Sequence, residues 1–124
     1  MSARVYVSGS IRDIENVRNI QNHLIERGCS ITHDWTRFSG PKMTFEEADR
    51  QLRAVWAAEV LILVVHPRLK AGWMEFGAAV GHRVPCIVVP HADVSESMWY
   101  TLPWVRMATP DGDLAEDVFE VVGW

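Results

Sequence analysis

The chain has 124 residues, of which 48% are hydrophobic, and its net charge is −4. This length fits one domain, and the composition excludes a disordered or low-complexity protein. The negative charge argues against a surface that follows the phosphates of duplex nucleic acid. No apolar run approaches the roughly 20 residues that a membrane span needs. Because residues 1–4 lack a signal-peptide pattern, we expect a cytoplasmic protein that has no membrane partner.

Short apolar runs alternate with helical patterns along the chain. Residues 4–8 predict the first strand, and apolar spacing over 13–27 predicts a helix that ends at Gly28. Residues 29–33 predict the second strand, and Thr44 to Glu47 has the form of a capping box that opens a helix to residue 57. The remaining expected elements are a loop over 34–43, a strand over 59–65, a helix over 72–82, a strand over 84–89, a loop over 90–103 with one helical turn near 96–100, a strand over 104–107 and a helix over 113–122.

This alternation predicts an α/β fold, in which a doubly wound parallel sheet of five strands is covered by helices on both faces. We expect a flavodoxin-like or Rossmann-like domain over residues 1–124, with the strand order 2-1-3-4-5. Cys29 and Cys86 lie on separate expected strands, so they are predicted to be free, buried thiols. Ligands of such sheets bind where the strand order reverses, which directs attention to the loops at 9–12 and 66–75.

The first of these loops has the residues of a small anion site. Gly9 allows a close approach of the backbone, Ser8 and Ser10 offer hydroxyls, and Arg12 offers a guanidinium group. The helix expected at Asp13 would point free N–H groups at the same place, which favours a phosphate. An ordinary strand-to-helix turn with a serine cap explains the same residues, and both interpretations stay open.

The second loop leads into Glu75, which we expect in the first turn of its helix. The positive end of the helix dipole keeps a carboxylate there ionised, and an ionised carboxylate is what a nucleophile requires. Acidic residues are also favoured in first turns without any catalytic role. The position of Glu75 therefore does not by itself distinguish a nucleophile from a helix-stabilising residue.

Two segments of the chain together resemble the nucleoside 2-deoxyribosyltransferase family and its relatives that hydrolyse deoxynucleoside 5′-monophosphates. The first is Ser8-Gly9-Ser10-Ile11-Arg12, which is similar to the phosphate-binding loop of the hydrolases. The second is Ala58-Glu59-Val60, then Gly72-x-x-Glu75-x-Gly77-x-Ala79, then Pro85. The family has an Ala-Asp dipeptide where this chain has Ala58-Glu59, and Gly-Lys-Pro where it has Arg83-Val84-Pro85. The likeness covers about two-thirds of the chain.

The resemblance implies an N-glycosidase or transferase in which Glu75 attacks the anomeric carbon of a small nucleotide or nucleoside and displaces the base. Water or a second base would then resolve the covalent glycosyl-enzyme. It also implies a homodimer or larger homo-oligomer, and we expect no cofactor and no metal. The residues that we assign to substrate binding are Tyr6, Ser8, Gly9, Ser10, Ile11, Arg12, Asp34, Trp35, His66, Arg68, Lys70, Gly72 and Met98.

The chain departs from the family at two places that bear on catalysis. The family carries an aspartate on the helix before the third strand, and the matching position here is Gln51, with Asp49 as the nearest acid. A regular helix would turn Asp49 to another face, but we keep both as candidate catalytic residues. The loop before Glu75 holds Arg68 and Lys70 where the transferases have an acid, which favours a phosphorylated substrate.

Several alternatives remain open from the sequence. Trp35 could stack on a base while Asp34 reads its edge, or the tryptophan could cover the core. The histidines that follow strands lack metal-ligand spacing, and the aromatic cluster around Met98 fits either a subunit interface or a lid over the core. A nucleotide-binding protein without turnover and an NAD-cleaving signalling domain are competing functions. A phospho-receiver domain is disfavoured, because it needs acids where this chain has Ser8 and His66.

Overall fold

A computed structural model describes residues 2–38, 44–92 and 97–123. It has a sheet of five parallel strands in the order β2-β1-β3-β4-β5, which confirms the predicted fold class and strand order. The strands are β1 (Arg4–Ser8), β2 (Ser30–Ile31), β3 (Val60–Val64), β4 (Cys86–Val89) and β5 (Val105–Met107). The α-helices are α1 (Ile14–Glu26), α2 (Phe45–Ala57), α3 (Ala71–Gly81) and α4 (Leu114–Val122). Short 3-10 helices lie at η1 (Ile11–Asp13), η2 (Trp35–Arg37) and η3 (Met98–Thr101).

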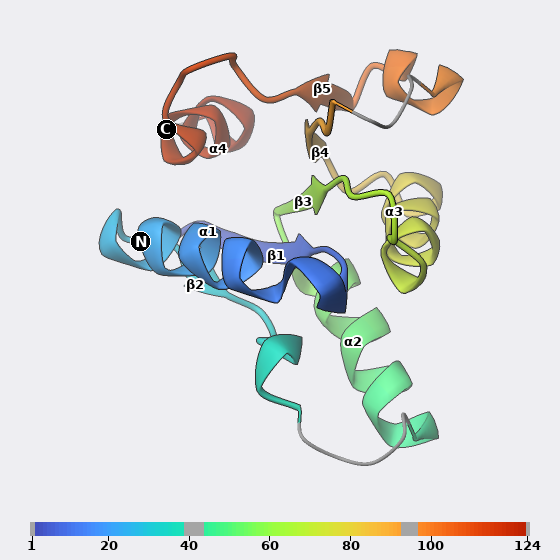
Figure 1. The fold of residues 1–124 in the computed structure, drawn as a ribbon. Helices are drawn as coiled ribbons and strands as arrows, with labels where there is room; N and C mark the ends of the chain where they lie inside the picture. The colour runs from blue at the N-terminus through green and yellow to red at the C-terminus, as the bar shows by residue number, and fades with distance from the viewer. Residues whose placement is uncertain (1, 39–43, 93–96, 124) are drawn as a thin grey trace.

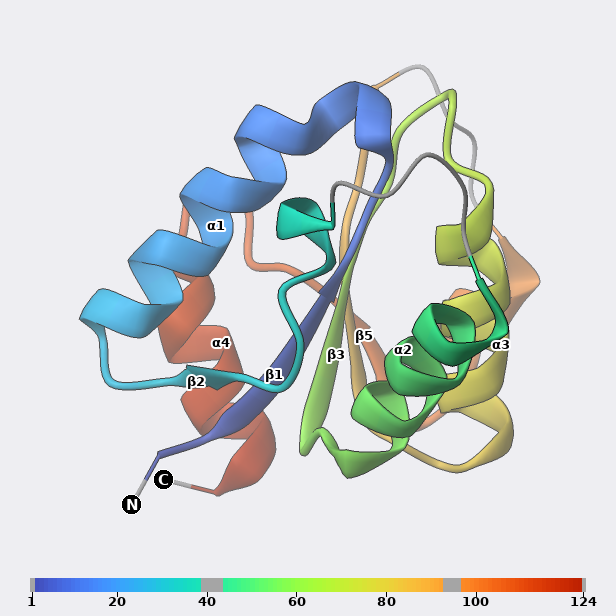
Figure 2. The same ribbon diagram turned by 90° about the horizontal axis from the view of Figure 1, so that it is seen from below.

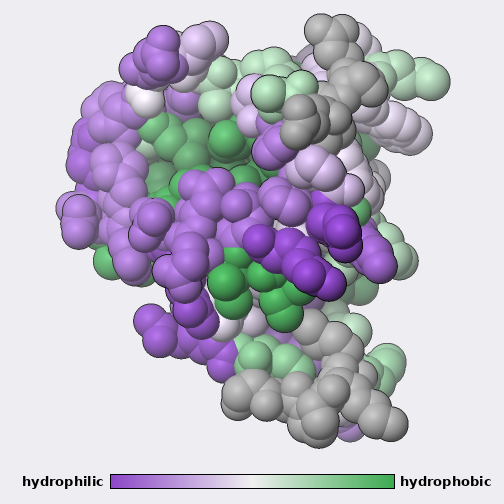
Figure 3. Space-filling view, in the orientation of Figure 1, coloured by the Kyte–Doolittle hydropathy of each residue, from purple (hydrophilic) through white to green (hydrophobic). Residues whose placement is uncertain are grey.

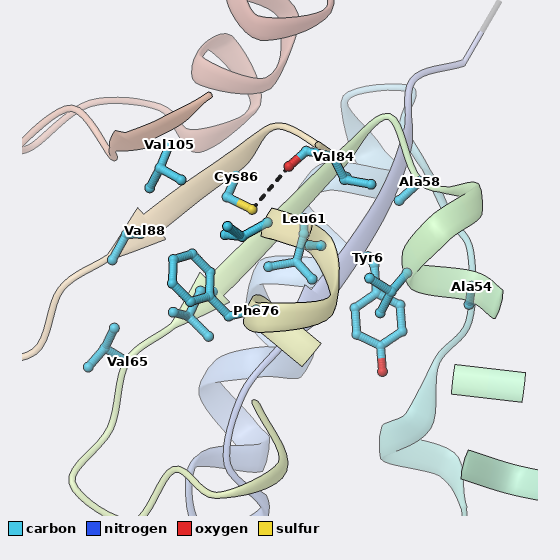
Figure 4. Packing of buried hydrophobic residues seen from close by; sticks show 14 of the residues in the cluster. Tyr6, Ala54, Ala58, Leu61, Val65, Phe76, Val84, Cys86, Val88 and Val105 are labelled. Carbon is cyan, nitrogen blue, oxygen red and sulfur yellow. Dashed lines mark hydrogen bonds between the residues drawn. The ribbon is translucent and has the colours of Figure 1, made fainter. Parts of the chain in front are cut away.

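The helices form two layers around the sheet. Helices α1 and α4 cover one face, and α2 and α3 cover the other (Figures 1 and 2). The central strand β3 is buried along its whole length, as its unbroken apolar run predicts for a strand covered on both sides. Each face has its own core: Val7 and Ile62 pack toward α1 and α4, whereas Tyr6 and Leu61 pack toward α2 and α3 (Figure 4). The site described below lies on the α2 and α3 side.

The edge strand β2 is shorter than predicted. Only Ser30 and Ile31 form the strand, where the sequence predicted residues 29–33. The strand pairs with β1 alone, and Asp34 then caps η2 and draws the chain away from the sheet. The predicted loop at 34–43 therefore contains a short helix. Its residues 39–43, which include Gly40-Pro41, lie outside the described part of the chain, as do residues 93–96 of the predicted loop at 90–103.

The two cysteines are free and buried, as predicted: Cys29 precedes β2, and Cys86 opens β4. Burial raises the pKa of the Cys86 thiol to about 12, so this thiol stays protonated at neutral pH. Both side chains act as small hydrophobic residues of the core.

The α1 and α4 face carries a hollow of its own. Figure 3 shows hydrophobic surface between the polar residues that cover these two helices. The hollow has a volume of about 550 Å³ and is lined by Ile20 and Leu114 together with the polar residues Asn19, His23, Asp111 and Asp113. It lies on the face of the sheet opposite to the site below. Within the described residues, none of the helices is both long enough and apolar enough to cross a membrane.

Candidate functional site

The side chain of Glu75 is held by two residues of β1. The hydroxyl of Ser8 donates to Oε1 of Glu75 at 2.7 Å, and the hydroxyl of Tyr6 donates a short hydrogen bond to Oε2. Both donors are fully buried, and they alternate with residues that face the other core. Figure 4 shows the Tyr6 ring in the core beside α2. The structure therefore places Tyr6 and Ser8 as residues that position Glu75, whereas the sequence assigned them to substrate binding.

The expected first-turn position of Glu75 is wrong. Helix α3 begins at Ala71, so Glu75 is its fifth residue and lies in the second turn, beyond the free N–H groups at the helix start. Burial is the main influence on the carboxyl group and raises its pKa, although the hydrogen bonds from Tyr6 and Ser8 act in the opposite direction. The ionised form depends on these two hydroxyls rather than on the end of the helix.

Gly72 allows α3 to lie this close to β1. A Cβ atom at this position would lie 2.3 Å from Cδ1 of Leu69 and 3.0 Å from the hydroxyl oxygen of Ser8. Leu69 is buried and has little room to move. A side chain here would push the first turn of α3 away from the strand that carries the two donors, so Gly72 acts by close approach rather than by contact with a ligand.

Positive charge gathers in a cavity beside Glu75. The cavity has a volume of about 390 Å³, within the range of small-molecule sites, and its walls combine the loop after β1 with the loop after β3. Its three cations are Arg12, Arg68 and Lys70. In the described residues, no acidic side chain forms an ion pair with them. A cation-lined wall of this kind favours an anionic ligand. The other lining residues are Gly9, Ser10, Ile11, Trp35, Gln51 and Ala71.

Ser10 joins the two loops of this cavity. Its hydroxyl accepts a hydrogen bond from the backbone N–H of Arg12 at 3.1 Å and donates to the carbonyl of Arg68 at 3.3 Å. The hydroxyl is therefore used within the protein, and Ser10 ties together the backbone at two of the three cationic residues. His66 has a related role, because its Nδ1 accepts from the backbone N–H of Arg68 at 3.0 Å.

A second cavity, of about 310 Å³, contains Glu75 and is otherwise mainly apolar. It is lined by Ala48, Leu52, Met74 and Ala78 of the flanking helices, and it shares Gln51 and Ala71 with the cation-lined cavity. Glu75 and the loop after β1 therefore face adjoining cavities with a common wall. They meet at the end of the sheet where the strand order reverses, which is the place to which the sequence directed attention.

A buried carboxylate that the sequence analysis missed lies behind this wall. Glu47 is 2% exposed, and its Oε2 accepts hydrogen bonds from Nε2 of His33 at 2.8 Å and from the amide of Gln51 at 3.0 Å. Its Oε1 accepts from Arg50 at 2.6 Å. Burial alone would raise the pKa of Glu47, but the hydrogen bonds from His33, Gln51 and Arg50, together with the charge interaction with His33, outweigh it and hold the pKa below its usual range. We therefore expect an ionised carboxylate at neutral pH, and both of its oxygens accept hydrogen bonds.

The capping-box pattern explains why Glu47 was overlooked. Thr44 does cap α2, since its hydroxyl accepts from the backbone N–H of Glu47 at 3.2 Å. The pattern predicts that the glutamate side chain turns back toward the cap, but here it faces inward to His33 and Gln51. The spacing of Glu47 and Gln51, four residues apart on one helical face, was the signal that could have linked the two.

The remaining predicted residues have different surroundings. Asp49 forms an ion pair with Arg53 at 2.9 Å on the exposed side of α2, outside both cavities, so the structure does not bring it to the site. Asp34 caps η2 by accepting from the backbone N–H of Thr36. Trp35 lines the cation cavity, where its indole N–H donates to the carbonyl of Val7 at 2.7 Å. Met98 lies exposed on η3 and lines neither cavity. In the described part of the chain, no three His, Cys, Asp or Glu side chains are grouped to hold a metal ion.

The role of Tyr6 gives a testable prediction about Glu75. Tyr6→Phe removes a donor that stabilises the ionised carboxylate, so the pKa of Glu75 is expected to rise further. The carboxyl carbon shift of Glu75, followed by NMR against pH, measures this change. Tyr100→Phe is the matched control, because the Tyr100 hydroxyl is buried and has no hydrogen-bond partner among the described residues. If the titration midpoint of Glu75 is the same in Tyr6→Phe as in the unmodified chain, Tyr6 does not stabilise the ionised carboxylate.

Comparisons with known proteins support the fold. No known family model and no curated protein sequence matches the chain. Among solved structures, the chain is similar to the crystal structure of a conserved protein from Enterococcus faecalis V583. The TM-score is 0.58 at 14% sequence identity, and the match covers 97% of this chain and 99% of that one. At this identity the likeness extends to the α/β fold alone.

Proposed function

We propose that the chain is an N-glycosidase or 2-deoxyribosyltransferase of the nucleoside 2-deoxyribosyltransferase type, acting on a nucleoside 5′-monophosphate with Glu75 as its nucleophile. One observation carries the proposal: a carboxylate held by two buried hydroxyls lies beside a cavity that is lined by three cations. Among the described residues, no acidic side chain forms an ion pair with these cations. The carboxylate provides the nucleophile, and the cations provide a place for the phosphate.

The reaction has two steps. In the first, an oxygen of Glu75 bonds to the anomeric carbon while the bond to the base nitrogen breaks, and the base leaves with the electron pair and takes a proton from water. In the second, water attacks the anomeric carbon, which releases the Glu75 carboxylate and the free sugar phosphate, with the second proton of that water passing to solvent. A second base in place of water gives transfer. The hydrogen bonds from Tyr6 and Ser8 hold Glu75 for attack and for departure.

The distribution of charge favours a phosphorylated substrate over a free nucleoside. Arg12, Arg68 and Lys70 line the cavity that adjoins the nucleophile, whereas the walls around Glu75 are mainly apolar. If the 5′-phosphate binds in the cation-lined cavity, the anomeric carbon and the base lie in the adjoining cavity that contains Glu75. The test is release of free base from a panel of ribo- and deoxynucleoside 5′-monophosphates, with the unphosphorylated nucleosides as controls and with and without an acceptor base. Equal turnover of the nucleosides would contradict the phosphate assignment.

Nucleotide binding without turnover is the second candidate function. Gln51 favours it, because an amide that lines both cavities stands where the resemblance expects an acid. An amide can bind a ligand but does not exchange a proton with a leaving base as a carboxylic acid does. Calorimetric binding of a monophosphate, with no base released over days of incubation, would favour this function over catalysis.

A further inference from the structure

Among the described residues, the wall shared by the two cavities has one polar side chain, that of Gln51, since the other shared residue is Ala71. A nucleotide with its phosphate among the three cations and its anomeric carbon at Glu75 has only the pentose between these two groups. The pentose must therefore pass this wall. This step rests on the proposed function, because that function sets which end of the nucleotide lies in which cavity.

The hydrogen bond to Glu47 sets which end of the Gln51 amide faces that carboxylate. An ionised carboxylate only accepts hydrogen bonds, so the amide must turn its NH₂ group toward Glu47, as the 3.0 Å contact shows. The carbonyl oxygen then points away from Glu47. Because His33 and Arg50 also hold the carboxylate, the amide has a fixed anchor. Gln51 thus offers an acceptor whose direction is set by a buried network.

We propose that Gln51 is the pentose-reading residue of the site, and that its amide oxygen accepts a hydrogen bond from a sugar hydroxyl. Glu47 acts on the substrate through Gln51 and is a positioning residue. The hydroxyls at the 2′ and 3′ carbons are the donors that a pentose presents, and loss of the right one leaves the acceptor without its partner.

The test uses calorimetric binding in a Glu75→Gln background, in which the nucleophile is removed. The ligands are the ribo, 2′-deoxy, 3′-deoxy and 2′,3′-dideoxy forms of adenosine and cytidine 5′-monophosphate. We expect the form that lacks the recognised hydroxyl to bind roughly three- to tenfold more weakly. The four forms identify whether the 2′ or the 3′ hydroxyl is read.

Adding Gln51→Met should remove this difference, so that all four sugars bind with similar affinity. Arg53→Met, on the exposed side of the same helix, is the matched control and should keep it. Glu47→Gln, which leaves Gln51 in place but allows its amide to turn, should weaken the discrimination and gives a second route if Gln51→Met folds poorly. The inference is wrong if Gln51→Met still distinguishes the four sugars as strongly as the Glu75→Gln background does. It is also wrong if the background protein does not distinguish them, or if none of the eight ligands binds.

The proposed function and this inference fail in different ways. If the unmodified chain releases no base from any nucleotide while Gln51 still governs sugar discrimination, catalysis fails and pentose reading stands. If base is released but discrimination is independent of Gln51, the nucleophile assignment stands and the role of Gln51 is wrong.

Discussion

Glu75→Gln is expected to abolish base release, with a loss in kcat of about a thousandfold or more, as for other catalytic nucleophiles. The substitution keeps the size of the side chain and its place beside Tyr6 and Ser8, but an amide does not form the glycosyl ester. The measurement is chromatographic detection of free base from the monophosphate that the unmodified chain cleaves best. Glu120→Gln on α4, where Glu120 pairs with Arg106 on the surface, is the control and should retain activity.

The pH profile provides an independent check of the same residue. The nucleophile acts as the carboxylate, and burial raises the pKa of Glu75 above the usual glutamate value. Activity should therefore be lost on the acid side at a higher pH than for an ordinary glutamate, whose pKa is about 4.3. Tyr6→Phe should shift this acid limb of kcat/KM upward. If a Glu75→Gln sample that is free of unmodified protein still shows full turnover, the proposed mechanism is wrong.

Glu47→Ala is expected to lower the free energy of unfolding by about 3 kcal/mol, the lower end of the cost of breaking a buried ion pair. The lower end applies because Arg50 is 60% exposed and regains water, whereas His33 is 21% exposed and regains less of it when its partner is lost. Urea denaturation at neutral pH measures the change. Glu46→Ala is the matched control one residue away, exposed in the same first turn, and should change stability by less than about 0.5 kcal/mol.

The pH dependence of this effect has a definite sign. The folded-state pKa of Glu47 is lowered, so its contribution to stability is fully present above the unfolded-state pKa of about 4.3 and is lost as the pH falls through the folded-state value. The difference between the unmodified chain and Glu47→Ala should therefore be largest near neutral pH and shrink in acid. A difference that stays constant down to strongly acidic pH would show that packing, rather than the charge network, accounts for the loss.

The sequence by itself determined the order of the elements and the end of the sheet at which the candidate site lies. Apolar runs such as 60–64 and the helical spacing over 14–26 reflect local periodicity, which each segment carries on its own. The right-handed connection of parallel strands then limits the topology, and the reversal of strand order fixes the edge at which the loop after β1 meets the loop after β3. The periodicity needs only residues that are close in the chain, and the connection rules hold for parallel sheets in general.

Only the tertiary structure decided how the polar side chains of the site are paired. The sequence placed Glu75 at a helix end, but its hydrogen bonds come from Tyr6 and Ser8, nearly seventy residues earlier in the chain. Glu47 matched a local capping pattern, yet it is buried against His33, which follows a different strand. A buried charge must find its donors wherever the packed elements supply them, and that choice is made across the whole fold rather than within a segment.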